Sequence, residues 1–169
     1  MKKIKYTLLI PCLNEKDTIV KAINDAKENC NKYIVKGYEI IIADNGSTDG
    51  SQTIAYSLGV KVSKGTGTVV DAIKRGLSVA SNENVIIMDS DGSHPTELVL
   101  TMANKLLEND LVIGVRGKSK DKGLNKLLSW GLNTLSYGLA PHIKDRASGF
   151  WGVRKSIVPD LDSKSIKPM

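Results

Sequence analysis

The chain has few cysteines, few aromatic residues and no long apolar run. Its 169 residues include two cysteines, Cys12 and Cys30, whose spacing forms no metal-binding or redox motif, so a reduced cytoplasmic setting is expected. No apolar stretch approaches the roughly 20 residues that a helix needs to cross a bilayer. The basic start leads at once into a short run, which we interpret as a first strand rather than a signal peptide. One Phe, five Tyr and two Trp, with no interleaved basic stripe, give little support to nucleic-acid binding.

The length of the chain indicates the number of domains, and its net charge indicates the kind of partner it favours. A chain of 169 residues fits one domain with its own core, so we expect a single domain over residues 1–169. The net charge of +6 favours anionic partners such as nucleotides or phospholipid headgroups. The Lys-rich region 116–126 would suit a peripheral contact with the cytoplasmic face of a membrane, although a solvated Lys-rich surface accounts for the charge equally well.

Short apolar strands alternate with amphipathic helices along most of the chain. We predict strands over 4–10, 39–43, 60–62, 84–88 and 111–115. Helices are predicted between them, over 15–31, 50–58, from Gly65 to about Ala80, over 95–108 and over 122–139. This rhythm predicts an α/β fold with a mainly parallel sheet and helices on both faces.

Acidic residues follow three of the predicted strands. Glu15 comes shortly after the first strand, Asp44 directly after the second, and Asp89-Ser90-Asp91 after the fourth. In parallel sheets, ligands bind outside the carboxyl ends of the strands. The three strand ends should therefore meet at one ligand-binding edge that can hold a cation or bind hydroxyl and amide donors.

Asp89 and Asp91 are the strongest candidates for a metal site. Two carboxylates one residue apart at the end of a buried strand can converge on one hard cation, Mg²⁺ or Mn²⁺, which keeps open positions for phosphate oxygens. Asp-x-Asp also occurs where Asp caps a helix or builds an Asx turn. The pair therefore needs support from the rest of the chain.

Two other chemistries fit less well. A dinucleotide site needs Gly-x-Gly-x-x-Gly after the first strand, and residues 11–15 (Pro-Cys-Leu-Asn-Glu) lack it. The segment 89–93 resembles the Asp-x-Asp-Gly-Thr loop of haloacid dehalogenase-type phosphatases. That loop normally follows the first strand rather than the fourth, and a later acidic pair for the metal is missing.

Six segments, in the same order, resemble family 2 glycosyltransferases with the GT-A fold, especially the polyprenol-phosphate (dolichol-phosphate) mannosyltransferase branch. The most specific is Asp89-Ser90-Asp91-Gly92-Ser93-His94-Pro95, which is similar to the branch's Asp-Ala-Asp-x-(Ser/Gln)-His-Pro signature. The others are residues 9–15, 41–50, 64–76, 114–116 and 145–150. Together the match covers about residues 6–155.

The resemblance implies a donor site for a nucleotide-diphosphate sugar, either GDP-mannose or a UDP-sugar. Asp89 and Asp91 would hold Mg²⁺ or Mn²⁺ across the diphosphate, with Ser93 as a further ligand. The remaining nucleotide-sugar-binding residues implied by the match are Pro11, Leu13, Glu15, Asp44, Lys64, Ser90 and Arg116.

The resemblance also implies an inverting transfer of a hexose, with mannose the first choice, to an acceptor such as a polyprenyl phosphate. Arg116 would bind the diphosphate or the incoming phosphate, because guanidinium geometry suits phosphate. A lipid phosphate is already anionic and needs no general base. A hydroxyl acceptor would need one, and Asp145 is then the candidate.

The chain departs from the family pattern in ways that leave a second function open. Asn45 follows Asp44 where the family has a second acid, and Gly92 replaces an apolar residue. Family members continue past the Ser-Gly-Phe element, whereas this sequence is C-terminally short. A catalytically silent nucleotide-sugar-binding or partner subunit is the alternative to an active enzyme.

Overall fold

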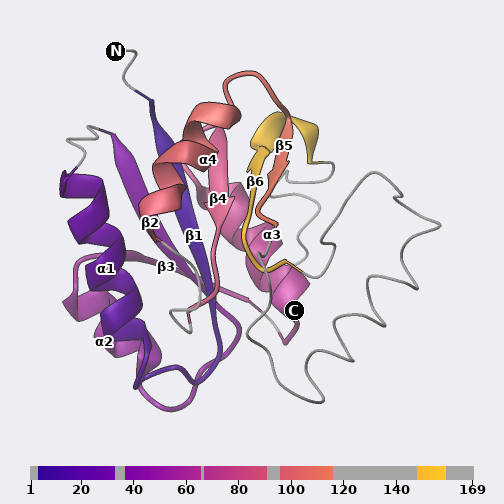
Figure 1. Cartoon of the computed structure of the whole chain (residues 1–169). Helices are drawn as coiled ribbons and strands as arrows, with labels where there is room; N and C mark the ends of the chain where they lie inside the picture. Colours follow the sequence, from indigo (N-terminus) through magenta and orange to yellow (C-terminus); the bar gives the residue numbers. More distant parts are fainter. Residues whose placement is uncertain (1–3, 33–36, 66, 91–95, 116–147, 159–169) are drawn as a thin grey trace, which may run out of the picture.

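The computed structural model describes residues 4–32, 37–65, 67–90, 96–115 and 148–158. These residues form a six-stranded sheet with the order β3-β2-β1-β4-β6-β5 (Figure 1). The strands are β1 (Tyr6–Cys12), β2 (Tyr38–Asp44), β3 (Lys61–Lys64), β4 (Asn84–Ile87), β5 (Leu111–Ile113) and β6 (Trp151–Arg154). The α/β architecture predicted from the sequence is confirmed.

The centre of the sheet is parallel. β1 pairs in parallel with β2 on one side and with β4 on the other, and β3 extends the parallel part beyond β2. β6 runs antiparallel to both β4 and β5. The carboxyl ends of β1, β2 and β4 therefore lie next to one another, which places the residues that follow them at one edge.

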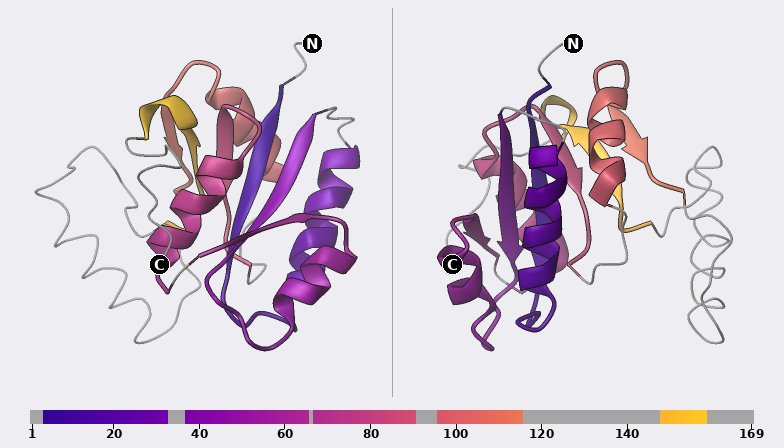
Figure 2. Two further views of the ribbon diagram at one scale, coloured as in Figure 1. Left: turned by 180° about the vertical axis from the view of Figure 1, so that it is seen from behind. Right: turned by 60° about the vertical axis from the view of Figure 1, so that its left-hand side comes forward.

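Helices cover both faces of the sheet (Figures 1 and 2). On one face lie α1 (Ile19–Lys32), α2 (Ser51–Ser57) and α4 (Val99–Lys105), the last preceded by the 3₁₀ turn η1 (Thr96–Leu98); a second 3₁₀ turn, η2 (Lys155–Ile157), follows β6. These helices share a core with alternate β1 residues such as Leu8 and Ile10. The other face is covered by α3 (Val69–Val79), which packs with Leu9 and Ile41. The two cores follow from strand alternation, since successive side chains point to opposite faces.

The amphipathic pattern predicted for the first helix is confirmed. Ile19, Ile23, Ala26 and Cys30 are all buried, at most 3% exposed. The corresponding prediction for α3 is partly wrong, because Val69 is 52% exposed. The buried residues of this helix are Ala72, Gly76 and Leu77, so Leu77 is buried as predicted, whereas two small residues that the prediction did not include also face the sheet.

Other boundaries differ modestly from the predictions. The helix predicted over 95–108 consists of η1 and the short α4, and the strand predicted over 111–115 ends at Ile113. The antiparallel β6 was not predicted. The helix predicted over 122–139 lies outside the described residues.

Candidate nucleotide-sugar site

A cleft of about 270 Å³ opens at the carboxyl edge of the parallel strands. Its lining comes from the residues that end or follow β1, β2 and β4, together with the first residue of α3: Pro11, Cys12, Leu13, Glu15, Asn45, Val69, Asp89 and Ser90. This is the edge where ligands bind to open α/β sheets. The structure thus brings Pro11, Leu13, Glu15, Asp89 and Ser90 to one place, although they were selected from separate segments.

The loops after β1 and β2 are joined by side-chain-to-backbone hydrogen bonds. The Asn14 amide donates to Ser47 Oγ at 2.9 Å, and the Thr48 amide donates to Asn14 Oδ1 at 2.8 Å. The Glu15 amide donates to Ser51 Oγ at 2.9 Å. These bonds satisfy backbone donors in two exposed loops, so one side of the cleft is held in shape before any ligand arrives.

Glu15 and Asp49 also shape the helix starts at this edge. The Glu15 carbonyl accepts from the Ile19 amide at 2.8 Å, which begins α1. Asp49 accepts from the Ser51 amide at 3.0 Å and from the Lys16 amide at 2.9 Å. The Ser51 hydroxyl donates to Asp49 as well, and these hydrogen bonds hold the pKa of its carboxyl at about 2. Glu15 therefore both lines the cleft and begins a helix.

Asp44 lies inside the molecule rather than among the residues that line the cleft. It is fully buried, and its Oδ2 accepts from the amides of Gly46 and Ser47 at 2.9 and 3.1 Å and from Gln52 Nε2 at 2.6 Å. Oδ1 is buried without a hydrogen-bond partner among the described residues. The bonds to residues two and three further on match the Asx-turn interpretation, and contact with a base stays a prediction.

Asn45 connects the second strand end to the third. Its amide donates to the Cys12 carbonyl at 2.9 Å, and its Oδ1 accepts from the Gly67 amide at 3.1 Å. The Gly65 amide donates to the Asp44 carbonyl at 2.6 Å. A Cβ on Gly65 would lie 2.8 Å from Ala72 Cβ, so glycine allows the chain to pass close to α3. The glycine-containing segment is thereby fixed beside the cleft.

Asp89 and Ser90 continue from β4 into the cleft. The Met88 amide still donates to the Leu9 carbonyl at 3.1 Å, whereas Asp89 is half-buried and Ser90 is 5% exposed. A carboxylate that lines the cleft fits Mg²⁺ or Mn²⁺, since both take oxygen ligands. Among the described residues, no three His, Cys, Asp or Glu side chains cluster as a metal site. The other predicted ligands, Asp91 and Ser93, lie outside the described residues.

The remaining predicted residues are placed as follows. Lys64 ends β3, opposite Asp44 in the strand register, and is exposed rather than part of the cleft lining. Arg116 and Asp145 lie outside the described residues, as does the Lys-rich region 116–126. Their predicted roles in phosphate binding, general-base catalysis and membrane contact stay predictions.

The sequence analysis did not select three of the cleft-lining residues, namely Cys12, Asn45 and Val69. Cys12 ends β1, Asn45 directly follows β2, and Val69 is the first residue of α3. Their positions at the ends of these elements were the only sign in the sequence that they could line the cleft. Cys12 is 3% exposed, and burial raises the pKa of its thiol despite its hydrogen bonds with Ser47 and Ser51, which lower it. Cys12 is therefore a neutral, apolar part of the cleft floor.

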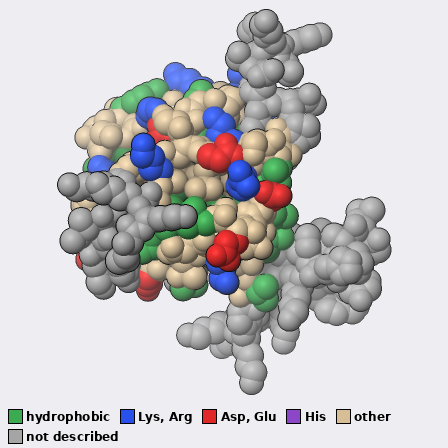
Figure 3. All heavy atoms as spheres, turned by 90° about the horizontal axis from the view of Figure 1, so that it is seen from above, with side chains coloured by type: hydrophobic (Ala, Val, Ile, Leu, Met, Phe, Trp, Pro, Cys, Tyr) green, Lys and Arg blue, Asp and Glu red, His purple; other side chains and the backbone are tan. Residues whose placement is uncertain are grey.

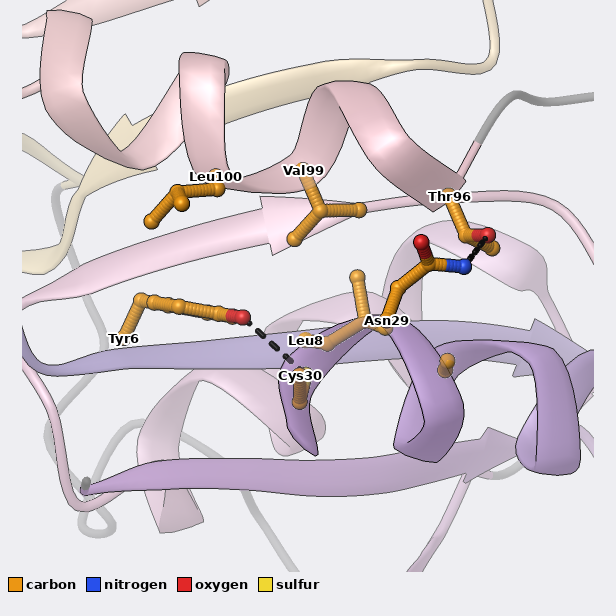
Figure 4. A pocket seen from close by; sticks show the side chains of 8 residues that line it. Tyr6, Leu8, Asn29, Cys30, Thr96, Val99 and Leu100 are labelled. Atoms are coloured by element: carbon orange, nitrogen blue, oxygen red, sulfur yellow. Dashed lines mark hydrogen bonds between the residues drawn. The ribbon is translucent and has the colours of Figure 1, made fainter. Parts of the chain in front are cut away.

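A second cavity, between β1, α1 and α4, is far too small to be a substrate site (Figure 4). Its volume of about 10 Å³ is at the lower limit for one water molecule. Tyr6 and Cys30 are hydrogen-bonded at 3.0 Å, and Asn29 Nδ2 donates to Thr96 Oγ1 at 2.5 Å. These bonds satisfy polar groups in the core, so we assign the cavity a packing role.

The opposite, amino edge of the sheet carries basic and acidic side chains side by side (Figure 3). Lys61 pairs with Glu39, and Arg154 pairs with Glu83 at 3.7 Å and with Asp110 at 3.2 Å. Mixed charge of this kind creates no strong field of one sign. Within the described ranges, no helix is both long and apolar enough to span a bilayer.

A mainly parallel α/β sheet with a cleft at its carboxyl edge and an aspartate at the exit of β4 is the arrangement of an open α/β protein that binds its ligand at the ends of its strands. The chain belongs to glycosyl transferase family 2, whose family model matches residues 7–161. The resemblance inferred from the six sequence segments is thereby confirmed, and the phosphatase alternative loses its support.

Curated relatives show the same family. The chain is 28% identical to a dolichol-phosphate mannosyltransferase of Pyrococcus furiosus over 96% of its own length and 50% of that protein. It is 32% identical to protein RfbJ of Shigella flexneri over 68% of its own length and 88% of RfbJ. The chain thus spans about half the length of the mannosyltransferase that it matches.

Solved structures show the GT-A fold. Mannosyl-3-phosphoglycerate synthase from Rubrobacter xylanophilus superposes with a TM-score of 0.71 at 20% identity, covering 90% of this chain and 53% of that one. Glucosyl-3-phosphoglycerate synthase from Mycobacterium tuberculosis, in complex with Mn²⁺, UDP-glucose and phosphoglyceric acid, superposes with a TM-score of 0.70 at 22% identity, covering 90% of this chain and 57% of that one. The predicted fold is confirmed.

Proposed function

We propose that this chain provides the donor site of an inverting glycosyltransferase that moves a hexose from a nucleotide-diphosphate sugar to an acceptor. One observation carries the proposal: in a member of glycosyl transferase family 2, the ends of β1, β2 and β4 converge on a 270 Å³ cleft that Asp89 lines. Such a volume, walled by a few polar groups and apolar side chains, is adequate for part of a nucleotide sugar.

Different cleft residues would contact different parts of the donor. Pro11, Leu13 and Val69 offer apolar surface, while Glu15 and Asn45 offer acceptor and donor groups for a base or ribose. Asp89 would hold a divalent cation, Mg²⁺ or Mn²⁺, together with the predicted ligands Asp91 and Ser93. When bound, such a cation neutralises charge that develops on the leaving nucleoside diphosphate.

The acceptor we propose is a polyprenyl phosphate. The support is the 28% identity to a dolichol-phosphate mannosyltransferase and the 26% identity to an undecaprenyl-phosphate 4-deoxy-4-formamido-L-arabinose transferase of Yersinia pestis, which covers 78% of this chain and 42% of that protein. A phosphate acceptor attacks the anomeric carbon as an existing anion, so the chain need supply no general base. A cytoplasmic protein in peripheral contact with a membrane would reach such an acceptor, and we propose that location with it.

Calorimetric titration tests the donor site. The purified chain is titrated with GDP-mannose and with UDP-glucose in Mn²⁺ and in EDTA. We expect Asp89→Asn to weaken Mn²⁺-dependent binding of the preferred donor about tenfold or more, since even supporting residues of metal sites are worth about 10–100-fold. Asp110→Asn, at the amino edge of the sheet beside Arg154, is the control and should bind as wild type. Equal affinity in Asp89→Asn and wild type would refute the proposed donor site.

Turnover separates an enzyme from a silent binding subunit. With donor and a polyprenyl phosphate present, we expect release of nucleoside diphosphate and formation of the glycosyl lipid phosphate. Donor binding without either product would favour the silent subunit, the alternative from the sequence analysis. The same assay with phosphoglycerate as acceptor tests the chemistry that the names of the solved neighbours suggest.

A further inference from the structure

Gly149 lies directly against the carboxyl group of Asp89. A Cβ built on Gly149 would be 1.9 Å from Asp89 Oδ2, 2.6 Å from its Cγ and 2.8 Å from its Oδ1, and these are its three nearest atoms. The backbone of Gly149 does not adopt a left-handed conformation. Glycine is therefore required here because a Cβ would collide with the Asp89 carboxyl group, and not because the backbone needs a positive φ.

The strand register explains why two residues so distant in sequence meet. β4 and β6 are antiparallel, with Ile87 opposite Trp151. Continuing that register by two residues sets Asp89 opposite Gly149, just beyond the last paired residues. Opposite residues of an antiparallel pair direct their side chains to the same face, so any side chain at 149 would compete with the Asp89 carboxylate.

The segment that carries Gly149 is anchored and cannot simply withdraw. Ser148 Oγ accepts from the Phe150 amide at 3.2 Å. The Phe150 carbonyl accepts from the Gly114 amide at 2.8 Å, and the Phe150 side chain is 4% exposed. These contacts tie Phe150 to the sheet and Ser148 to Phe150, so the backbone at Gly149 is held from its C-terminal side and the Asp89 carboxylate is the part that must yield.

We propose that Gly149 is a positioning residue that sets where the Asp89 carboxylate lies in the cleft. The missing side chain leaves room for the carboxylate, and the anchored backbone limits the directions in which it can turn. The role rests on the proposed function, in which Asp89 holds the cation and donor. The contact between the two residues stands without it.

A thermodynamic cycle tests the contact by thermal unfolding in EDTA. The four proteins are wild type, Gly149→Ala, Asp89→Ala and the double variant. We expect Gly149→Ala to lower the Tm in the wild-type background and to lower it much less when Asp89 is already Ala, because the atoms that the Cβ meets are gone. If Gly149→Ala does not fold alone, folding of the double variant supports the contact. An equal loss in both backgrounds, or failure to fold in both, overturns it.

Gly152→Ala is the matched control. Gly152 also has a backbone outside the left-handed region and lies in β6, but a Cβ there would meet Leu106 Cδ1 at 2.9 Å. It should lower the Tm by the same amount whether residue 89 is Asp or Ala. If the Tm loss caused by Gly152→Ala depended on residue 89 as strongly as that caused by Gly149→Ala, any change near β6 would have this effect. That result would overturn the assignment of Gly149 as the residue in contact with Asp89.

Mn²⁺ binding, followed by the electron paramagnetic resonance signal of the free ion, tests the positioning role without any turnover. We expect Gly149→Ala to bind Mn²⁺ about tenfold more weakly than wild type, by analogy with residues that orient metal ligands, and Gly152→Ala to bind as wild type. A wild-type chain that binds no Mn²⁺ overturns the metal site and with it this role. Intact wild-type binding that Gly149→Ala leaves unchanged overturns the positioning role alone.

Discussion

Individual carboxylates at the two edges of the sheet have different roles: one lines the cleft, and others are held by hydrogen bonds within the protein. At the carboxyl edge, Asp89 lines the cleft while Asp44, the last residue of β2, is fully buried. At the amino edge, Glu39 accepts hydrogen bonds from Thr7 Oγ1 at 2.8 Å, from the Ser81 amide at 2.9 Å and from Lys61. Burial opposes ionisation of Glu39, but these bonds outweigh it and hold its pKa at about 2 instead of 4.5.

The low pKa of Glu39 predicts an acid-dependent loss of stability. Because the folded-state value lies below the unfolded one, the stabilisation is present above about pH 4.5 and is lost as the pH falls towards 2. We expect Glu39→Gln to lower the free energy of unfolding by about 1–3 kcal/mol at pH 7 and by much less near pH 2. Urea unfolding across this pH range measures the difference. Glu108→Gln, an exposed carboxyl after α4, is the control, and a pH-independent effect of Glu39→Gln would contradict the prediction.

At the scale of the elements, α3 lies close against the sheet at Gly76. A Cβ on Gly76 would lie 2.4 Å from Leu9 Cδ1, and Leu9 is fully buried in β1. The buried residues of this helix, Ala72, Gly76 and Leu77, are mostly small, which allows its backbone to lie near the strands. The position of α3 in turn sets where Val69 meets the cleft.

We predict that Gly76→Ala destabilises the protein although alanine favours helices by about 1 kcal/mol over glycine. Overpacking against Leu9 should cost about 1–3 kcal/mol. In the Leu9→Val background, which removes the δ-carbon in contact, the same substitution should cost less or become stabilising. Urea midpoints of the four variants measure the coupling, with Lys74→Ala on the exposed side of α3 as control. Strict additivity of Gly76→Ala and Leu9→Val would argue against this contact.

For the whole molecule, β6 decides how the second half of the sheet is assembled. It lies between β4 and β5, so β5 joins the sheet only through it. Phe150, directly before β6, and Val153 within it are each 4% exposed and belong to the two separate cores. The same segment brings Gly149 to Asp89.

We therefore predict that a chain ending at residue 147 does not form the native sheet. Loss of β6 would expose one side of β4 and disconnect β5, and an unpaired apolar strand edge favours aggregation. Circular dichroism, gel filtration and thermal unfolding should show a loss of cooperative melting. A chain ending at residue 158 keeps every described strand and should melt cooperatively. Cooperative unfolding of the shorter chain, with an unchanged Tm, would contradict the prediction.

Much of the fold could be predicted because local pattern encodes it. Ile19, Ile23, Ala26 and Cys30 recur at helical spacing, and the apolar runs of β1, β2 and β4 are bounded by polar residues. The convergence of three strand ends followed from parallel topology alone. The family resemblance added the roles of Asp89 and its neighbours, and the family is confirmed.

Other features could not be predicted, because they depend on contacts between distant segments. The pattern of β6 does not reveal that it inserts antiparallel between β4 and β5. Val69 has the apolar character of a core residue, yet it lies at the start of α3 beside the cleft and is 52% exposed. Asp44 was expected in the ligand site, and only the fold shows that its Oδ2 accepts two hydrogen bonds from the loop that follows it and a third from Gln52 in α2.

By itself, the sequence determined the alternation of strands and helices, the family and the edge of the sheet where acids gather, since periodicity and local motifs depend on neighbouring residues. Only the tertiary structure decided which of these acids line the cleft and which is buried at the end of its strand. It also decided that a glycine before β6 adjoins Asp89. The physical reason is that strand order and register, which no single segment encodes, determine which side chains share the same space.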